Sequence, residues 1–192
     1  LVARLYDADS GEIRVDEQNI QDVNLNRLRQ SIGYVPQEAF LFSTDIAKNI
    51  SFGIDNNSMD LVIEAAKNAH LHENIMEFPK GYQTKVGERG VTLSGGQKQR
   101  LSIARAIIKK PPVLIFDDCL SAVDTETEEK ILSNLKNLTD QRTSLIISHR
   151  VSSVKNADQI IVLEDGKIIE QGKHAELMKI KGYYVNMYEQ QL

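Results

Sequence analysis

Apolar residues follow two different spacings along the chain. Short apolar runs predict buried strands at VLIF (113–116) and TSLIIS (143–148). Between them, TETEEKILSNLKNL places its apolar residues at helical spacing. Because a strand, a helix and a second apolar strand follow one another, we predict a parallel sheet that is buried on both faces.

The region before these strands has a different character. Strands are expected at residues 12–16 and 32–36, where apolar positions alternate or cluster between turn residues. Long helical patterns then occupy residues 58–78 and 96–110. These helices interrupt the strand pattern, so we predict a helical insertion in an α/β core.

In the C-terminal part of the chain, the sequence pattern predicts a hairpin flanked by helices. The segment QIIVLEDGKIIEQG (159–172) has two strand-like halves around Asp165-Gly166, a pair typical of a tight β-turn. Helices are expected at residues 150–157 before the hairpin and at 174–192 after it.

Composition narrows the class of protein. The 192 residues are 41% hydrophobic and 26% charged, which is enough apolar material for a core. The formal net charge of -4 makes the chain a poor general binder of nucleic acid. No apolar run reaches the roughly 18 residues that suggest a membrane span. The single Cys119 excludes an internal disulfide, and we expect a small, partly buried side chain there rather than a nucleophile.

Two adjacent carboxylates end the strand at 113–116. Ligands of parallel α/β sheets bind at the carboxyl ends of the strands. Asp117 there is placed to hold Mg²⁺ beside nucleotide phosphates, and Asp118 to orient or deprotonate an attacking water. The alternative is that both acids only cap the following helix.

A glycine pair precedes the helix expected at 96–110. In TLSGGQKQR (92–100), Gly95 and Gly96 let a ligand approach the backbone, while the helix start and the Ser94 hydroxyl offer hydrogen-bond donors. This pattern predicts an anion site suited to a phosphate. The alternative is an ordinary serine cap with a glycine-rich entry.

These motifs, taken in order, resemble the nucleotide-binding domain of ABC transporters. LSGGQ (93–97) with the KQRLSIARAI that follows resembles the signature motif. VLIFDD (113–118) follows in the order typical of the family, and SAVD (121–124) resembles the D-loop. The resemblance extends over essentially all of the chain.

The resemblance implies ATP and Mg²⁺ as the bound groups, with specific residues at the site. Gln37 resembles the Q-loop glutamine and, with Asp117, is implied as a metal contact. Asp118 and His149 are implied as the catalytic pair, His149 being the switch histidine that contacts the γ-phosphate. Without the resemblance, His149 reads only as a residue at the end of a strand. The implied nucleotide-binding residues are Gln37, Ser94, Gly95, Gly96, Gln97, Ser121 and Asp124.

Other segments resemble the exporter branch of this family, in which the cassette follows a transmembrane domain. They are LFSTDIAKNISFG (41–53), VGERG (86–90) and the tail KGYYVNMYEQQL (181–192). The resemblance implies two partners: the coupling helices of a transmembrane domain and a second cassette in an ATP-sandwich dimer. It also implies a place at the cytoplasmic face of the plasma (inner) membrane, and no nucleic acid.

The implied fold class is α/β: a RecA-like P-loop NTPase core with a mostly parallel sheet and an inserted α-helical subdomain. We divide the chain into a partial catalytic core at 1–37, a helical subdomain with the signature at 38–110, and the remaining core with C-terminal helices at 111–192.

One departure from the family is the P-loop, which ends in Gly-Lys-Ser/Thr. Gly-Lys occurs only at 166–167 and 172–173, each followed by a different residue. The opening LVARLYDADSG resembles the end of the helix that follows a P-loop, so we expect an N-terminal truncation. Without the P-loop cradle, the 192-residue chain is expected to bind ATP weakly or not at all.

A second departure is Asp118, which stands where the family has a catalytic Glu. One methylene less withdraws the carboxylate by about 1.5 Å, and a misplacement of about 1 Å costs on the order of 100-fold in rate. We therefore expect slow hydrolysis at this site and an intact signature that serves a partner, as in one half of a heterodimer. The alternative is a homodimer that tolerates Asp.

Three other functions stay in view. An importer ATPase subunit would carry similar motifs. A truncated interaction module would pair with a partner without hydrolysing ATP. A chromosome-maintenance or DNA-repair ATPase of the same family is disfavoured, because the interval between Gln37 and Ser94 is too short for a long coiled coil.

Overall fold

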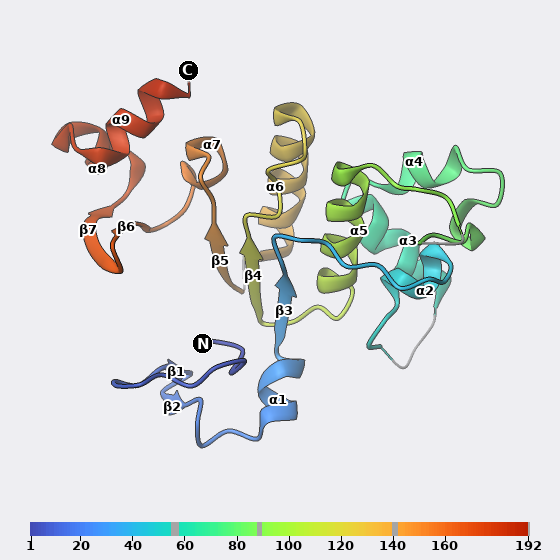
Figure 1. Cartoon of the computed structure of the whole chain (residues 1–192), viewed down its shortest axis with the longest axis horizontal. Coiled ribbons are helices and arrows are strands. Elements are labelled where there is room, and N and C mark those ends of the chain that lie inside the picture. Colours follow the sequence, from blue (N-terminus) through green and yellow to red (C-terminus); the bar gives the residue numbers. More distant parts are fainter. Residues whose placement is uncertain (55–57, 88–89, 140–141, 192) are drawn as a thin grey trace.

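The computed structural model describes residues 1–54, 58–87, 90–139 and 142–191. Its centre is a three-stranded parallel sheet in the order β3 (Ile32–Val35), β4 (Val113–Asp117) and β5 (Thr143–Ile147). Figure 1 shows the three arrows running in the same direction. The α/β class with a parallel sheet is therefore confirmed, and it is consistent with a RecA-like core.

Helices connect and cover the strands of this sheet. The elements around it are α1 (Leu25–Gln30), α5 (Gly95–Ile107), α6 (Thr125–Thr139) and α7 (Val151–Val154). A group of short helices lies on the far side of α5 (Figure 1): α2 (Ile46–Ile50), α3 (Met59–Asn68), α4 (His72–Met76) and a 3₁₀ turn at Gly81–Gln83.

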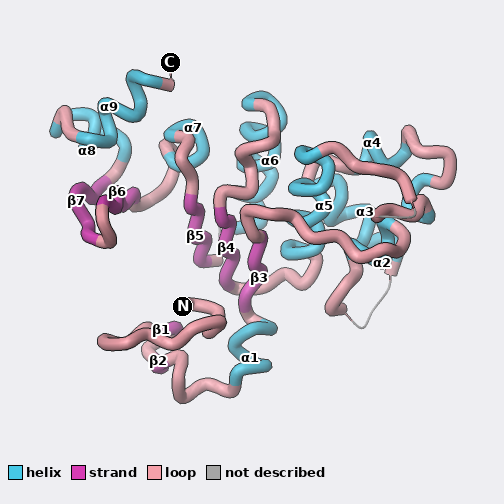
Figure 2. The backbone as a smooth tube through the Cα atoms, viewed as in Figure 1, coloured by secondary structure: helices cyan, strands magenta, loops and turns pink. Residues whose placement is uncertain are grey.

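Two small antiparallel units complete the fold, as the tube in Figure 2 shows. One joins β1 (Arg14–Val15) to β2 (Gln18–Asn19), and the other joins β6 (Ile160–Glu164) to β7 (Lys167–Gly172). The predicted hairpin is confirmed, with positive φ at Asp165 (48°) and Gly166 (75°). Helices α8 (His174–Ile180) and α9 (Tyr183–Gln190) follow it.

Two helical predictions need correction. The pattern over 58–78 is divided into α3 and α4, because the chain turns at His70, whose φ is +56°. The helix expected at 150–157 is a single turn, α7. In both cases the apolar spacing was present, but a local turn ended the helix.

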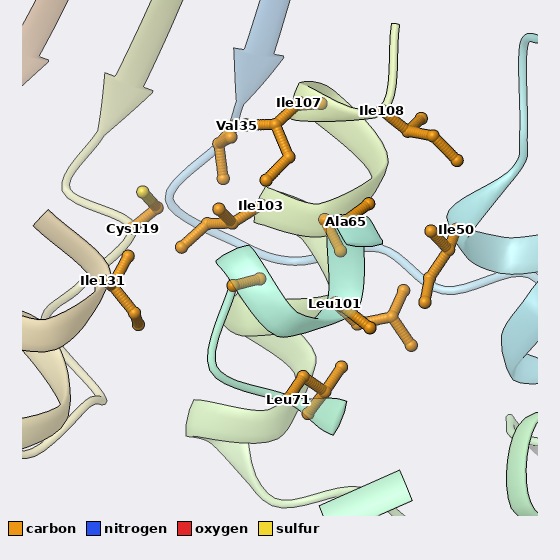
Figure 3. Packing of buried hydrophobic residues seen from close by; sticks show 14 of the residues in the cluster. Val35, Ile50, Ala65, Leu71, Leu101, Ile103, Ile107, Ile108, Cys119 and Ile131 are labelled. Atoms are coloured by element: carbon orange, nitrogen blue, oxygen red, sulfur yellow. The ribbon is translucent and has the colours of Figure 1, made fainter. Parts of the chain in front are cut away.

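Helix α5 joins the sheet to the short helices through one continuous apolar core. Figure 3 shows its Ile103 and Ile107 beside Val35 of β3, with Leu101 on the side of Ile50. All of these side chains are buried. The helix that begins at the signature is thus packed between the sheet and the short helices.

Gly33 makes this close approach of α5 to β3 possible. A Cβ at Gly33 would lie 2.7 Å from Cγ of Pro111 and 2.9 Å from the carbonyl oxygen of Ala106. Real Cβ atoms do not approach backbone this closely, so a side chain here would push the end of α5 away from the sheet.

The expectation of a sheet buried on both faces holds for β4 but not for β5. In β4, Leu114, Ile115 and Phe116 are buried. In β5, Leu145 and Ile147 are 46% and 42% exposed. The prediction was wrong for β5, which is the edge strand of the described sheet and keeps the side chains of Leu145 and Ile147 exposed among the described residues.

Candidate functional site

The carboxyl ends of the three parallel strands bring the predicted core of the site together. Val35 pairs with Phe116 and Asp117 pairs with Ile147 in the sheet register. Gln37 and His149 each follow their strand by two residues, so both lie at the edge where Asp117 and Asp118 emerge. The structure therefore gathers side chains from β3, β4 and β5 at one edge, where parallel sheets bind ligands.

Asp117 is held by a tyrosine that the sequence did not indicate. The Tyr34 hydroxyl donates to Oδ2 of Asp117 over 2.9 Å. Partial burial raises the pKa of Tyr34, and the hydrogen bond to the Asp117 carboxylate raises it further. Tyr34 is thus a neutral donor that orients Asp117 while leaving its other oxygen available.

Asp118 stands in an unusual backbone conformation. Its φ is +42°, a region that non-glycine residues seldom adopt. Its N–H donates to the carbonyl of Ile147 over 2.8 Å, and its carbonyl accepts from the Ser121 hydroxyl over 2.9 Å. The side chain meets Nε2 of Gln37 at 3.3 Å. Strained backbone of this kind clusters at functional sites, where the surroundings fix it.

The two acids are not caps of the next helix, which was the alternative prediction. That position belongs to Asp124, whose Oδ1 accepts from the backbone N–H of Thr127 over 2.9 Å. This hydrogen bond, with one from the Thr127 hydroxyl, lowers the pKa of Asp124. Asp117 and Asp118 point instead to Tyr34 and Gln37.

The signature residues form the start of α5. Oγ of Ser94 accepts from the N–H of Gln97 at 3.2 Å, and Oε1 of Gln97 accepts from the N–H of Ser94 at 3.0 Å. Ser94 is therefore a helix cap, as the alternative interpretation of this segment predicted. Because its oxygen is the acceptor in that bond, its O–H is still free to donate to an anion.

The start of α5 lies against the D-loop. A Cβ on Gly96 would lie 3.0 Å from the carbonyl oxygen of Ala122. This close approach explains the glycine in structural terms. Ser94 and Gly95 are exposed, and Ser121 and Asp124 of the D-loop are exposed as well. The predicted nucleotide-binding residues of both segments thus reach the surface.

His149 lies in a loop whose backbone is fixed from two directions. The side-chain amide of Gln191, just after α9, donates to the carbonyl of His149 and accepts from the N–H of Val151, both over 2.8 Å. The next residue, Arg150, reaches the D-loop. The His149 ring is exposed at the sheet edge.

Sequence reasoning missed several residues that support the site: Tyr34, Gln99, Arg150 and Gln191. Only Arg150 had a signal, because it directly follows the predicted switch histidine. In the VGERG segment, Glu88 and Arg89 lie outside the described residues.

Other predictions about single residues also changed. Cys119 is 1% exposed rather than partly buried, and burial raises the pKa of its thiol to about 12. No site pattern surrounds His72 or His174 in the sequence, which predicts surface positions for both. In the structure they are half-buried and pair through Nδ1 with the hydroxyls of Tyr82 and Tyr184, each at 2.8 Å.

Comparison with known proteins decides the family. A family model described as "ABC transporter" matches residues 1–121. The chain belongs to the ABC transporter family. It is an ATP-binding domain of this family, homologous to the corresponding domain of ABC exporters.

The relatives include bacterial and eukaryotic transporters. The chain is 50% identical over 191 residues to YfiB of Bacillus subtilis (strain 168), an uncharacterized ABC transporter ATP-binding protein, covering 100% of the chain and 33% of the relative. It is 47% identical over 190 residues to the mitochondrial iron-sulfur clusters transporter ATM1 of Chaetomium globosum, covering 98% and 32%.

A solved structure agrees in detail. A bacterial Atm1-family ABC exporter with ATP bound matches with a TM-score of 0.94 and 44% identity, over 99% of this chain and 34% of that one. The chain thus spans about a third of the length of the relatives it matches. Among the described residues, no helix has the length and apolarity needed to cross a bilayer.

The donor set of this ABC domain suits Mg²⁺ rather than a soft metal. Asp117 and Gln37 offer only oxygen ligands at adjoining strand ends, and Mg²⁺ takes few protein oxygens beside water and phosphate. The described residues contain no cluster of three or more His, Cys, Asp or Glu that could hold a metal on its own. The residues present therefore fit a Mg²⁺ that arrives with its nucleotide.

Proposed function

We propose that this chain is the ATP-hydrolysing motor domain of an ABC exporter, which works in an ATP-sandwich dimer at the cytoplasmic face of the plasma (inner) membrane. The observation that carries the proposal is the meeting of Gln37, Asp117, Asp118 and His149 at one edge of the sheet. The likeness to an exporter structure with ATP bound supports it.

Each residue has a role in this proposal. Asp117 and Gln37 hold Mg²⁺, which when bound neutralises charge on the β- and γ-phosphates. Asp118 orients or deprotonates the attacking water, and His149 contacts the γ-phosphate. The signature, Ser94 to Gln97, and the D-loop residues Ser121 and Asp124 contact nucleotide across the dimer, so that the signature and Asp117 serve different ATP molecules.

A matched pair of histidine variants tests the motor function. In the full-length protein that carries this chain, wild type should hydrolyse ATP in a Mg²⁺-dependent manner, and His149→Ala should lose most of that turnover. His174→Asn is the control, because the His174 ring pairs with the Tyr184 hydroxyl and not with a residue of the proposed site. A wild-type protein without ATPase activity, or equal activity in His149→Ala, would contradict the proposal.

The surface beside the Q-loop supports docking of the transmembrane coupling helices. A cavity of about 330 Å³ lies there. Its lining comes from two separate stretches of the chain, one just after Gln37 and one around the signature: Ala39, Leu41, Gly87, Val91, Thr92, Leu93 and Lys98. Phe40, next to this lining, is 64% exposed. Large apolar side chains exposed at a hollow are typical of a protein–protein contact. We also propose that the helical subdomain at 38–110 is the part that receives these helices.

A finer version of this proposal is that the chain belongs to the half of a heterodimer whose own ATP site is degenerate. Asp118 contacts Gln37, and its side chain is shorter than that of Glu, which favours slow hydrolysis at this site. The signature is capped and exposed, which favours a competent contact with the ATP bound by the partner.

A second candidate is a non-hydrolysing interaction module. The 192 residues contain no Gly-Lys-Ser/Thr, and such a module would pair with a partner without turning over ATP. Calorimetry of this chain with Mg²⁺ and ATP should show weak binding or none under either candidate. ATP hydrolysis by the full-length protein that carries the chain separates them: a motor domain turns ATP over, and an interaction module does not.

A further inference from the structure

The backbone of the D-loop (residues 121–124) is hydrogen-bonded from two directions. On one side, the N–H of Ala122 donates to Oε1 of Gln99 at 3.1 Å. Gln99 belongs to the signature helix α5 and is 6% exposed. On the other side, Arg150 donates through Nη2 to the carbonyl of Ser121 and through Nη1 to that of Val123, both at 3.0 Å.

Arg150 is itself held rigidly. Its Nη1 also lies 3.0 Å from Oε2 of Glu128, whose side chain is 1% exposed. The other carboxylate oxygen of Glu128 accepts from the hydroxyl of Ser153, which belongs to α7. A planar guanidinium with three fixed acceptors has little freedom to reorient, and lysine offers no equivalent fork.

Position makes this contact functionally relevant. Arg150 directly follows His149, and the D-loop residue Asp124 directly follows Val123. A shift of the loop that carries His149 therefore pulls on the D-loop through Arg150, and a shift of α5 pulls on it through Gln99. The D-loop is the only described segment that both side chains hold by its backbone.

We propose that Arg150 is a positioning residue that keeps the D-loop in register with His149, and that Gln99 ties the same loop to the signature helix, so that the three segments move as one unit. The inference rests on the proposed function, because it assumes that His149 and the D-loop contact nucleotide. It assigns no direct contact with nucleotide to Arg150 or Gln99.

The expected effects are those of misplacement rather than of lost binding. A shift of about 1 Å at a reacting group costs on the order of 100-fold in rate, and the remaining contacts limit the shift. We expect Arg150→Lys, which keeps the charge beside Glu128, to lower kcat for ATP by about 10-fold with KM changed less than about twofold. Gln99→Leu keeps the side-chain volume but removes the acceptor for the N–H of Ala122, and it should change kcat and KM to an extent similar to that of Arg150→Lys.

A double-mutant cycle in the full-length, assembled transporter tests the coupling. The side chains of Gln99 and Arg150 hold different atoms of the D-loop, so independent effects would multiply to about 100-fold. If they act through one unit, the double variant should be no more than about 10-fold to 20-fold below wild type. Arg14→Lys is the control, since Arg14 pairs with Glu12 on the surface. Multiplicative losses, or a raised KM with unchanged kcat, would overturn the proposal.

A second measurement applies even if Arg150→Lys does not fold. Amide hydrogen exchange of Gln99→Leu should rise in the D-loop and also in residues 148–152, although the Gln99 side-chain hydrogen bond given among the described residues goes to the D-loop. A rise confined to the D-loop would overturn the coupling. Wild type without ATPase activity would refute the proposed function itself, which separates that failure from a failure of the coupling alone.

Discussion

The side-chain nitrogen of Gln37 lies 3.3 Å from Oδ2 of Asp118. The two residues follow neighbouring strands, β3 and β4, whose register fixes their separation. This contact keeps the short carboxylate close to the strand ends. A glutamate on the same backbone would place its carboxylate about 1.5 Å farther out.

Asp118→Glu should therefore raise ATP turnover at this site. We expect an increase of at least about 10-fold, since a 1 Å error in position is worth up to about 100-fold. Steady-state hydrolysis by the full-length assembly measures it, with the exposed Asp22→Glu as control. Unchanged turnover, with both sites already equally active, would rule out a degenerate site.

Ser94→Ala should loosen the first turn of the signature helix. The variant removes the acceptor for the N–H of Gln97, a loss of about 1 kcal/mol, or about fivefold faster exchange of that amide. The control is Ser58→Ala, because Ser58 occupies the cap position of α3 without a side-chain cap hydrogen bond among the described residues. Equal exchange in both variants would show that the cap does not stabilise α5.

Asp124 should make the stability of the domain dependent on pH in the acid range. Its folded pKa lies below the usual value, because the ionised carboxylate accepts from the N–H of Thr127. The stabilisation is fully present above the unfolded value of about 3.9 and is lost as the pH falls through the lower, folded value. The difference in denaturation midpoint between wild type and Asp124→Asn should be constant near neutral pH and change below about pH 4. A difference that stays constant down to the acid limit would contradict this assignment.

Cys119 should resist thiol reagents while the domain is folded. Its side chain is 1% exposed, and its thiol has a pKa of about 12 because of burial, so little thiolate is present at neutral pH. In a background without other cysteines, Ellman's reagent should label it only after denaturation, while a Ser10→Cys control labels at once. Prompt labelling of native Cys119 would mean that this turn opens readily.

The parallel sheet, Asp117 at a strand end and Ser94 at a helix start could be predicted from local patterns, whereas Gln37 and His149 were assigned only through the family resemblance. Four apolar residues running into Asp117, and Ser-Gly-Gly before a long helix, each depend on neighbouring positions only. The hairpin at Asp165-Gly166 is local as well. Such features can be predicted from sequence because the backbone conformation depends on a few neighbouring residues.

What the sequence could not predict depends on distant partners. The contact between Tyr34 and Asp117 joins different strands, and Gln191 reaches the loop of His149 from just after the C-terminal helix. The exposure of β5 also escaped prediction, because an apolar run shows that a strand is suited to burial, not that a neighbour covers it.

The bare flank of β5 affects how the 192-residue chain would behave in a test tube. In the described sheet β5 pairs only with β4, so the N–H and C=O groups on its other side are unpaired there, close to the exposed side chains of Leu145 and Ile147. An edge of this kind templates a strand from another molecule. The 192-residue chain should therefore aggregate at high concentration, and Leu145→Lys should reduce that aggregation.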